Sequence, residues 1–130
     1  MNSNESKFTA DQNRQQSKID LPVFTKWMDF MKWQLNALDN FPKKARFNFS
    51  DRIINIMLQN VDFLVEARYN RNKSAQLKSI NLNLEKMRIL LRICFEQRYI
   101  SIKSYEYAIT RINEIGKMIG GWMKQQQGLS

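Results

Sequence analysis

The residues of this sequence whose type and spacing could do chemistry are lysines and arginines, and the chemistry they favour is the binding of phosphate groups. The densest run is Lys43-Lys44-Ala45-Arg46-Phe47, and a second group surrounds the predicted turn at 70–73. Cationic side chains hold nucleic acid by its phosphates and read little base sequence. We therefore predict nucleic-acid contacts at Lys43, Lys44, Arg46, Arg68, Arg71, Lys73 and Lys78, with Arg111 and Lys117 as secondary contacts.

The net charge favours a polyanionic partner. The formal charge is +9, and the first twenty residues contribute none of it because three cations there balance three anions. An excess of this kind on a folded domain is typical of proteins that meet nucleic acid, a membrane surface or an acidic protein. Two alternatives stay open: each cation is a solvated charge, or the run at 43–47 is a connector that keeps the protein in solution.

Several kinds of site are excluded by what the sequence lacks. The chain has no histidine, the commonest general base and metal ligand, and its single cysteine is Cys94. One cysteine without histidine cannot form the usual zinc site, and no glycine-rich phosphate loop occurs. We therefore predict no catalytic residue, no metal and no cofactor, and interpret Cys94 as a small core residue.

The hydropathy pattern argues against membranes and secretion. No apolar run reaches the roughly 18 residues of a membrane-spanning helix, and the polar N-terminus lacks the apolar core of a signal peptide. We expect a cytoplasmic protein without a membrane partner. A basic amphipathic protein on a membrane surface is the alternative, but a closed bundle does not supply the exposed amphipathic helix that this class needs.

Apolar periodicity predicts a helical scaffold for the cations. Spacings of three and four residues between apolar positions predict helices over 23–38, 50–69, 74–98 and 102–125. The predicted N-terminal caps of these helices are, in order, Asp20, Ser50, Ser74 and Ser101. Short connections make neighbouring helices antiparallel, so the predicted fold class is an all-α, up-down-up-down four-helix bundle. We predict one bundle domain over 20–126, a flexible polar tail over 1–19 and a flexible C-terminus over 127–130.

Each predicted helix has an apolar stripe that should face the core. For the first helix the predicted stripe is Phe24, Met28, Met31, Leu35 and Leu38, with Trp27 beside it. For the third helix it is Leu77, Ile80, Leu84, Met87, Leu91, Cys94 and Arg98. For the last helix it is Ile102, Tyr105, Ile109, Ile112, Gly116, Ile119 and Met123.

Apolar residues also lie on the backs of three predicted helices. A single bundle buries one stripe per helix, so this surplus predicts self-association, although periodicity gives no number of subunits. For Trp33 the alternative is a large side chain folded over a neighbouring helix. We predict an oligomer or partner interface formed by Trp33, Leu82, Ile89, Ile93, Met118 and Trp122.

The last predicted helix contains Gly116, Gly120 and Gly121. Glycine inside a helix costs about 1 kcal/mol relative to alanine. Close approach of another backbone would offset that cost. A loop at Gly120-Gly121 is the alternative interpretation.

The same helix carries the first motifs of a resemblance. The segments 105–108 (Tyr-Glu-Tyr-Ala) and 114–122 (Glu-Ile-Gly-Lys-Met-Ile-Gly-Gly-Trp) look like a C-terminal family signature. Three earlier segments also occur in the order that the family has. They are the Phe-Pro-basic run at 41–47, Glu-Ala-Arg-Tyr at 66–69 and the Leu-Arg-rich core at 87–92. Over about 22–125 the chain resembles the accessory variability determinant (Avd) proteins of diversity-generating retroelements. These belong to a wider group of four-helix bundles encoded by intervening sequences in bacterial ribosomal RNA genes.

The resemblance implies a homopentameric barrel with a basic exterior and no enzymatic activity. It implies binding to the reverse transcriptase of the retroelement and to its template RNA and cDNA. The implied role is support of mutagenic, adenine-directed cDNA synthesis and retrohoming in a bacterial, archaeal or phage-encoded system. Two alternatives are a bundle associated with the ribosome or its RNA, and a protein-only scaffold for the reverse transcriptase that touches no nucleic acid.

Overall fold

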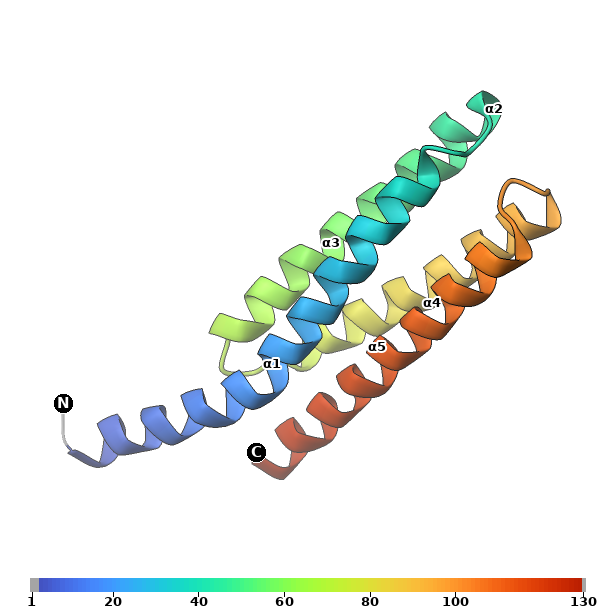
Figure 1. Ribbon diagram of the computed structural model, residues 1–130. Helices are drawn as coiled ribbons and strands as arrows, with labels where there is room; N and C mark the ends of the chain where they lie inside the picture. Colours follow the sequence, from blue (N-terminus) through green and yellow to red (C-terminus); the bar gives the residue numbers. More distant parts are fainter. Residues whose placement is uncertain (1–2, 130) are drawn as a thin grey trace.

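The computed structural model describes the backbone of residues 3–129 and the side chains of residues 19–128. This described part is all-helical, as the apolar periodicity predicts. Its long helices are α1 (Ser3–Leu38), α3 (Asp51–Tyr69), α4 (Ser74–Glu96) and α5 (Ile102–Leu129). A short helix, α2 (Lys43–Ala45), and a π-helical turn, η1 (Arg46–Ser50), lead into α3 (Figure 1).

The long helices form a bundle in which each packs against two others. Both α1 and α4 contact α3 and α5. The connections lie at alternate ends of the bundle in Figure 1. As a result, α2 and the α4–α5 connection over 97–101 share one end, here named the α2 end. The α3–α4 connection over 70–73 lies at the opposite end, here named the turn end (Figure 1).

The core confirms the predicted stripe of α4 and corrects that of α1. On α4 the buried apolar positions are Leu77, Ile80, Leu84, Met87, Leu91 and Cys94, as predicted. Arg98, the last position of the predicted stripe, is instead exposed and lies beyond the end of α4. On α1 the buried stripe instead runs through Val23, Trp27, Phe30 and Leu38, and the positions predicted to face inward are only half-buried except Leu38. The indole of Trp27 donates a hydrogen bond to the Met57 carbonyl at 3.3 Å, and the ring of Phe30 lies 5.5 Å from it. These large aromatic surfaces gain more from burial than the thinner side chains beside them, so they set the helix rotation.

The predicted stripe of α5 is also rotated. Its buried side chains are Ala108, Ile112, Ile115, Ile119 and Trp122, whereas Ile102 is exposed. Trp122 therefore belongs to the core of the chain. A tryptophan buries more apolar area than the methionine next to it, which explains why it faces inward.

The helix boundaries differ from the prediction mainly where the first two predicted helices begin. The second predicted helix begins earlier, because α2 and η1 precede it, and Ser50 makes no side-chain cap. Ser101 does cap α5, since its Oγ accepts a hydrogen bond from the Ser104 N–H at 3.1 Å. At the α4 start the capping bond comes from Asn72, whose Oδ1 accepts from the Ser74 N–H.

The first helix begins at Ser3, earlier than the predicted start near Val23, and it contains Pro22. The side chains of residues 1–18 and 129–130 lie outside the described residues. The flexible tail over 1–19 and the flexible C-terminus over 127–130 therefore stay predictions. Within the described chain, none of the helices combines the length and apolarity that crossing a bilayer requires.

Candidate functional site

The α2 end is built on a small aromatic cluster. Phe41 is buried before Pro42, and its ring lies 6.4 Å from the ring of Tyr99. Phe49 meets the same tyrosine edge-on at 5.9 Å. The ammonium of Lys44 lies 5.7 Å from the centre of the Tyr99 ring, a cation–π distance. The cluster thus joins the α4–α5 connection to the segment that carries the basic run.

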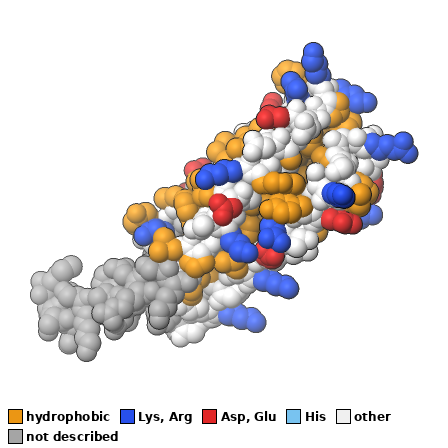
Figure 2. Space-filling view, viewed as in Figure 1, with side chains coloured by type: hydrophobic (Ala, Val, Ile, Leu, Met, Phe, Trp, Pro, Cys, Tyr) orange, Lys and Arg blue, Asp and Glu red, His pale blue; other side chains and the backbone are white. Residues whose placement is uncertain are grey.

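The cations of this end are exposed. Lys43, Lys44 and Arg46 all reach solvent, as do Arg98 and Lys103 from the adjoining α4–α5 connection and the start of α5. Figure 2 shows Lys and Arg side chains gathered at this end of the molecule. The fold therefore adds two cations to the predicted run, and sequence spacing alone did not connect them with it. Phe47, which directly follows Arg46 in the chain, has 85% of its surface exposed.

Arg98 has an unusual backbone conformation, which places it just beyond the end of α4. Its φ of 63° lies in the left-handed region, and a helix that ends on such a residue usually has glycine there. Its N–H donates to the Phe95 carbonyl, and the Tyr99 N–H donates to the Cys94 carbonyl at 2.8 Å. This pair of hydrogen bonds ends α4 and turns the chain. No glycine marks the stop, so the sequence prediction carried the helix through Arg98.

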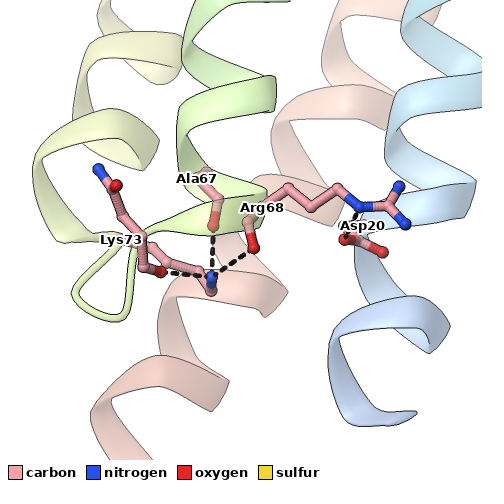
Figure 3. Close-up of polar contacts among 5 residues, drawn as sticks. Asp20, Ala67, Arg68 and Lys73 are labelled. Atoms are coloured by element: carbon pink, nitrogen blue, oxygen red, sulfur yellow. Dashed lines mark hydrogen bonds and ion pairs between the residues drawn. The ribbon is translucent and has the colours of Figure 1, made fainter. Parts of the chain in front are cut away.

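At the turn end, the side chain of Lys73 bonds to the chain's own backbone. Its side chain is buried, and its ammonium donates hydrogen bonds to the carbonyls of Ala67, Arg68 and Asn70, the last at 2.7 Å (Figure 3). Burial lowers the pKa of Lys73, and the nearby Asp20 carboxylate partly opposes that shift. These carbonyls are the acceptors left open at the end of α3. We therefore assign Lys73 a structural role and leave it out of the contact surface.

Arg68, at the same end, forms an ion pair within the chain. Its Nε lies 3.9 Å from Oδ2 of Asp20, which is buried, while the arginine side chain is about half exposed (Figure 3). The neighbouring Arg71 and Lys78 are exposed. The turn end therefore offers fewer uncommitted cations than the α2 end. The two ends are separated by the length of α3, about 28 Å for its 19 residues.

Arg111 and Lys117 lie along α5, away from both ends. Arg111 pairs with Glu114 at 3.1 Å and lies 5.2 Å from the centre of the Tyr107 ring. The hydrogen bond from Lys26 to Glu114, at 2.8 Å, is the main cause that lowers the pKa of this carboxyl. Lys117 is exposed and is not joined to the other predicted contacts.

Lys117 borders an open polar groove between α4 and α5. Its other lining residues are Asn81, Arg88, Asn113 and Gly116. A Cβ on Gly116 would lie 3.2 Å from Nη2 of Arg88, so a side chain there would press on that guanidinium. Gly120 and Gly121 are helical, and within the described part nothing lies within 4 Å of the Cβ that either would carry. The backbone approach expected at this glycine pair is therefore not made by any of the described residues.

The predicted interface residues divide into two groups. Leu82, Ile89 and Ile93 are exposed along α4, with exposed fractions of 58%, 54% and 37%. Trp33 is half-buried, with its ring 4.4 Å from that of Tyr107, and Met118 is half-buried against the core. Trp122 is buried. The alternative interpretation of Trp33, a side chain folded over a neighbouring helix, is the one that the geometry favours.

The arrangement contains a cationic end and an apolar stripe, and its one thiol is buried. Burial raises the pKa of Cys94 to about 11, so the thiol is protonated at neutral pH. Among the residues that the structure describes, no group of three or more Asp, Glu or Cys side chains could hold a metal ion. What the exposed groups can do is bind phosphates and pack against another surface.

Comparison with known proteins identifies one family. A family model described as bAvd-like matches residues 22–126. No curated protein matches the chain. The matched region covers the bundle from Pro22 to near the end of α5, including α2 and both ends.

Proposed function

The chain belongs to the bAvd-like family, and from that premise we propose that it is the accessory protein of a diversity-generating retroelement, acting by binding nucleic acid and the reverse transcriptase. Avd-like proteins are an accessory, non-catalytic kind of protein. The proposed work is to hold template RNA and cDNA near the polymerase during mutagenic cDNA synthesis and retrohoming. The polymerase supplies the chemistry.

The observation that carries this proposal is the exposed α2 end. Lys43, Lys44 and Arg46 share this end with Arg98 and Lys103, and Phe47, which follows Arg46 in the chain, is 85% exposed. Cations of this kind neutralise phosphates, and an exposed aromatic ring lets an unpaired base stack without regard to sequence. Arg71 and Lys78 at the turn end and Lys117 on α5 are proposed as weaker contacts.

We further propose that copies assemble through α4. The antiparallel up-down-up-down bundle leaves Leu82, Ile89 and Ile93 on one outer face of that helix, at spacings of seven and four residues. Burying apolar surface contributes about 25 cal/mol per Å². The pentameric number comes from the family resemblance. Light scattering of the wild type and of a Leu82→Asp/Ile89→Asp variant tests this: the variant should fall to a single 15.6 kDa chain. Ile102→Asp, at an exposed apolar residue of α5, is the control and should leave the assembly intact.

A salt series tests the nucleic-acid part. Filter binding of single-stranded RNA should weaken as salt rises, with a slope of log K against log salt near −0.7 for each neutralised phosphate. An affinity that does not change between low and physiological salt would remove phosphate binding from the account.

Co-purification with the reverse transcriptase tests the partner part. We expect capture of the polymerase to survive nuclease treatment, and capture of template RNA to require the basic end. A chain that retains the polymerase but binds no RNA under any salt condition would be a protein-only scaffold. A chain that instead captures ribosomal RNA and no polymerase would belong to the ribosome-associated branch of the wider group.

A further inference from the structure

A second exposed apolar surface lies on α3, apart from the one on α4. Leu58 and Val65 are 47% and 43% exposed, comparable to the 58% and 54% of Leu82 and Ile89. In each pair seven residues separate the two side chains, so both members lie on one face of their helix. We name two patches, each with the charged residue that lies between its apolar pair. The α3 patch is Leu58, Asp62 and Val65, and the α4 patch is Leu82, Lys86 and Ile89.

The charged residues of the two patches have opposite signs. Asp62 follows the first apolar residue of its patch by four positions, and Lys86 does the same in the other patch. Residues four apart are neighbours on a helix surface, so each charge lies beside its apolar pair. Both side chains are exposed, and neither forms an ion pair with another described residue. Each charge is therefore open to a partner.

The two patches face different sides of the bundle. Val65 lines a pocket at the turn end together with Phe24 of α1, so the α3 patch lies on the α1 side of α3. The helix α4 has its main contacts with α3 and α5 and lies across the bundle from α1 (Figure 1). One chain therefore cannot bring its own two patches together. A contact between an α3 patch and an α4 patch joins two copies head to tail.

The charges select a second copy as the occupant of the α3 patch. Two α4 patches placed face to face would bring two Lys86 ammonium groups together, and two α3 patches would bring two Asp62 carboxylates together. Like charges across a contact disfavour both pairings, whereas an α3 patch against an α4 patch joins opposite charges. Nucleic acid suits the α3 patch poorly, because its phosphates would meet the carboxylates of Asp62 and the exposed Glu66.

We propose that the α3 patch is the docking surface for the α4 patch of a second copy, with the Asp62 carboxylate opposite the Lys86 ammonium. The inference rests on the proposed assembly through α4 and adds the face that receives that helix. Each copy then donates one patch and accepts with the other, so successive contacts form a ring wherever the rotation between copies closes.

An antiparallel crossing of the two helices fits the spacing of their side chains. Copies arranged around an axis parallel to the bundle keep one direction, so α4 of one copy runs antiparallel to α3 of the next. The charged residues then lie opposite each other to within one residue, because each stands between its apolar pair. A further apolar pair extends the contact, since Ile54 is half-buried on α3 and Ile93 is exposed on α4. The aligned apolar pairs are Leu58 with Ile89, Val65 with Leu82, and Ile54 with Ile93.

A mixture of two variants of the full chain tests the head-to-tail arrangement. Leu58→Asp/Val65→Asp removes the α3 patch and keeps the α4 patch, and Leu82→Asp/Ile89→Asp does the reverse. In light scattering each variant alone should be a single chain of 15.6 kDa. Their equimolar mixture should form a particle of two chains, because one matched contact remains. The Ile102→Asp control should keep the wild-type assembly, and circular dichroism checks that every variant keeps its helices.

Exchange of the two charges tests their pairing with substitutions that leave the apolar residues in place. Asp62→Lys and Lys86→Asp should each weaken assembly about tenfold, because each puts like charges across the contact. The double variant Asp62→Lys/Lys86→Asp restores opposite charges and should assemble to within about threefold of the wild type. Sedimentation over a concentration series measures all four proteins.

The outcomes separate this surface from the proposed assembly. Full assembly of the Leu58→Asp/Val65→Asp variant, a mixture without two-chain particles, or a double exchange no better than its worse single variant overturns the α3 docking surface while assembly through α4 stands. Loss of polymerase capture by the Leu58→Asp/Val65→Asp variant with its assembly unchanged also overturns it, and assigns the α3 patch to the reverse transcriptase. A wild type that stays a single chain, or a Leu82→Asp/Ile89→Asp variant that still assembles, removes the proposed assembly itself.

Discussion

The two ends of the bundle carry similar basic residues and use them differently. At the α2 end, Lys43 and Arg46 are exposed, and an aromatic cluster around Tyr99 holds the segment that carries them. At the turn end, Lys73 is buried on backbone carbonyls and Arg68 pairs with Asp20. The comparison teaches that a cation near a helix end can either stay exposed, open to a partner, or become part of the chain's own cap. Only the fold distinguishes these roles.

The largest expected effect is on RNA affinity at the α2 end. The double change Lys43→Glu and Arg46→Glu should weaken single-stranded RNA binding by about 100-fold, or about 2.7 kcal/mol. The matched double change Arg71→Glu and Lys78→Glu at the turn end should weaken it by only about tenfold. Both variants should keep the helical circular dichroism spectrum. Equal losses at the two ends would break the comparison.

The second effect is on stability at the turn end. Lys73→Ala leaves the last carbonyls of α3 without their ammonium donor and should cost about 2 kcal/mol of unfolding free energy. Lys78→Ala, on an exposed lysine five residues later, should change it by less than about 0.5 kcal/mol. Urea unfolding measures both. If the two lysines proved equivalent, Lys73 would return to the list of phosphate contacts.

A pair of tyrosines sharpens the comparison further. Tyr99→Ala removes the ring that contacts Phe41, Phe49 and Lys44, and should cost about 1.5 kcal/mol because the ring is only partly buried. Tyr69→Ala at the other end removes a ring that is 79% exposed and should leave the melting temperature nearly unchanged. Thermal melts of the two variants, compared side by side, decide whether the aromatic cluster supports the α2 end.

The smallest expected effect has opposite signs for stability and binding. Arg98→Gly relieves a left-handed residue and should stabilise the chain by about 1 kcal/mol. The same change removes an exposed cation from the α2 end and should lower RNA affinity a few-fold. A variant that gains stability without losing affinity would show that Arg98 serves only to end α4.

Much of the scaffold follows from the sequence, while the rotation of its helices does not. The α4 stripe that begins at Leu77 is predictable because polar residues separate most apolar positions over 77–88, and the same spacing continues to Cys94. On α1 and α5 apolar residues occupy most of the circumference, so periodicity could not rank Phe24 against Trp27 or Met123 against Trp122. The cost of leaving a large aromatic ring in water decides those cases.

The candidate site divides in the same way. The run at 43–47 was predictable as a basic segment, and its exposure agrees with that prediction. The inclusion of Arg98 and Lys103 depends on which connections share an end, and the burial of Lys73 depends on carbonyls five or six residues earlier in the chain. The turn-end pocket lined by Asp20, Tyr69 and Trp122, among others, joins residues from three helices and has no signal in local spacing.

Photocrosslinking of bound RNA tests the central claim, that nucleic acid lies on the α2 end, most directly. After irradiation and trypsin cleavage at Arg46 and Arg52, the peptide over 47–52 contains the exposed Phe47 and should carry nucleotide adducts that disappear at high salt. Adducts confined to other peptides, with none on 47–52, would contradict the account.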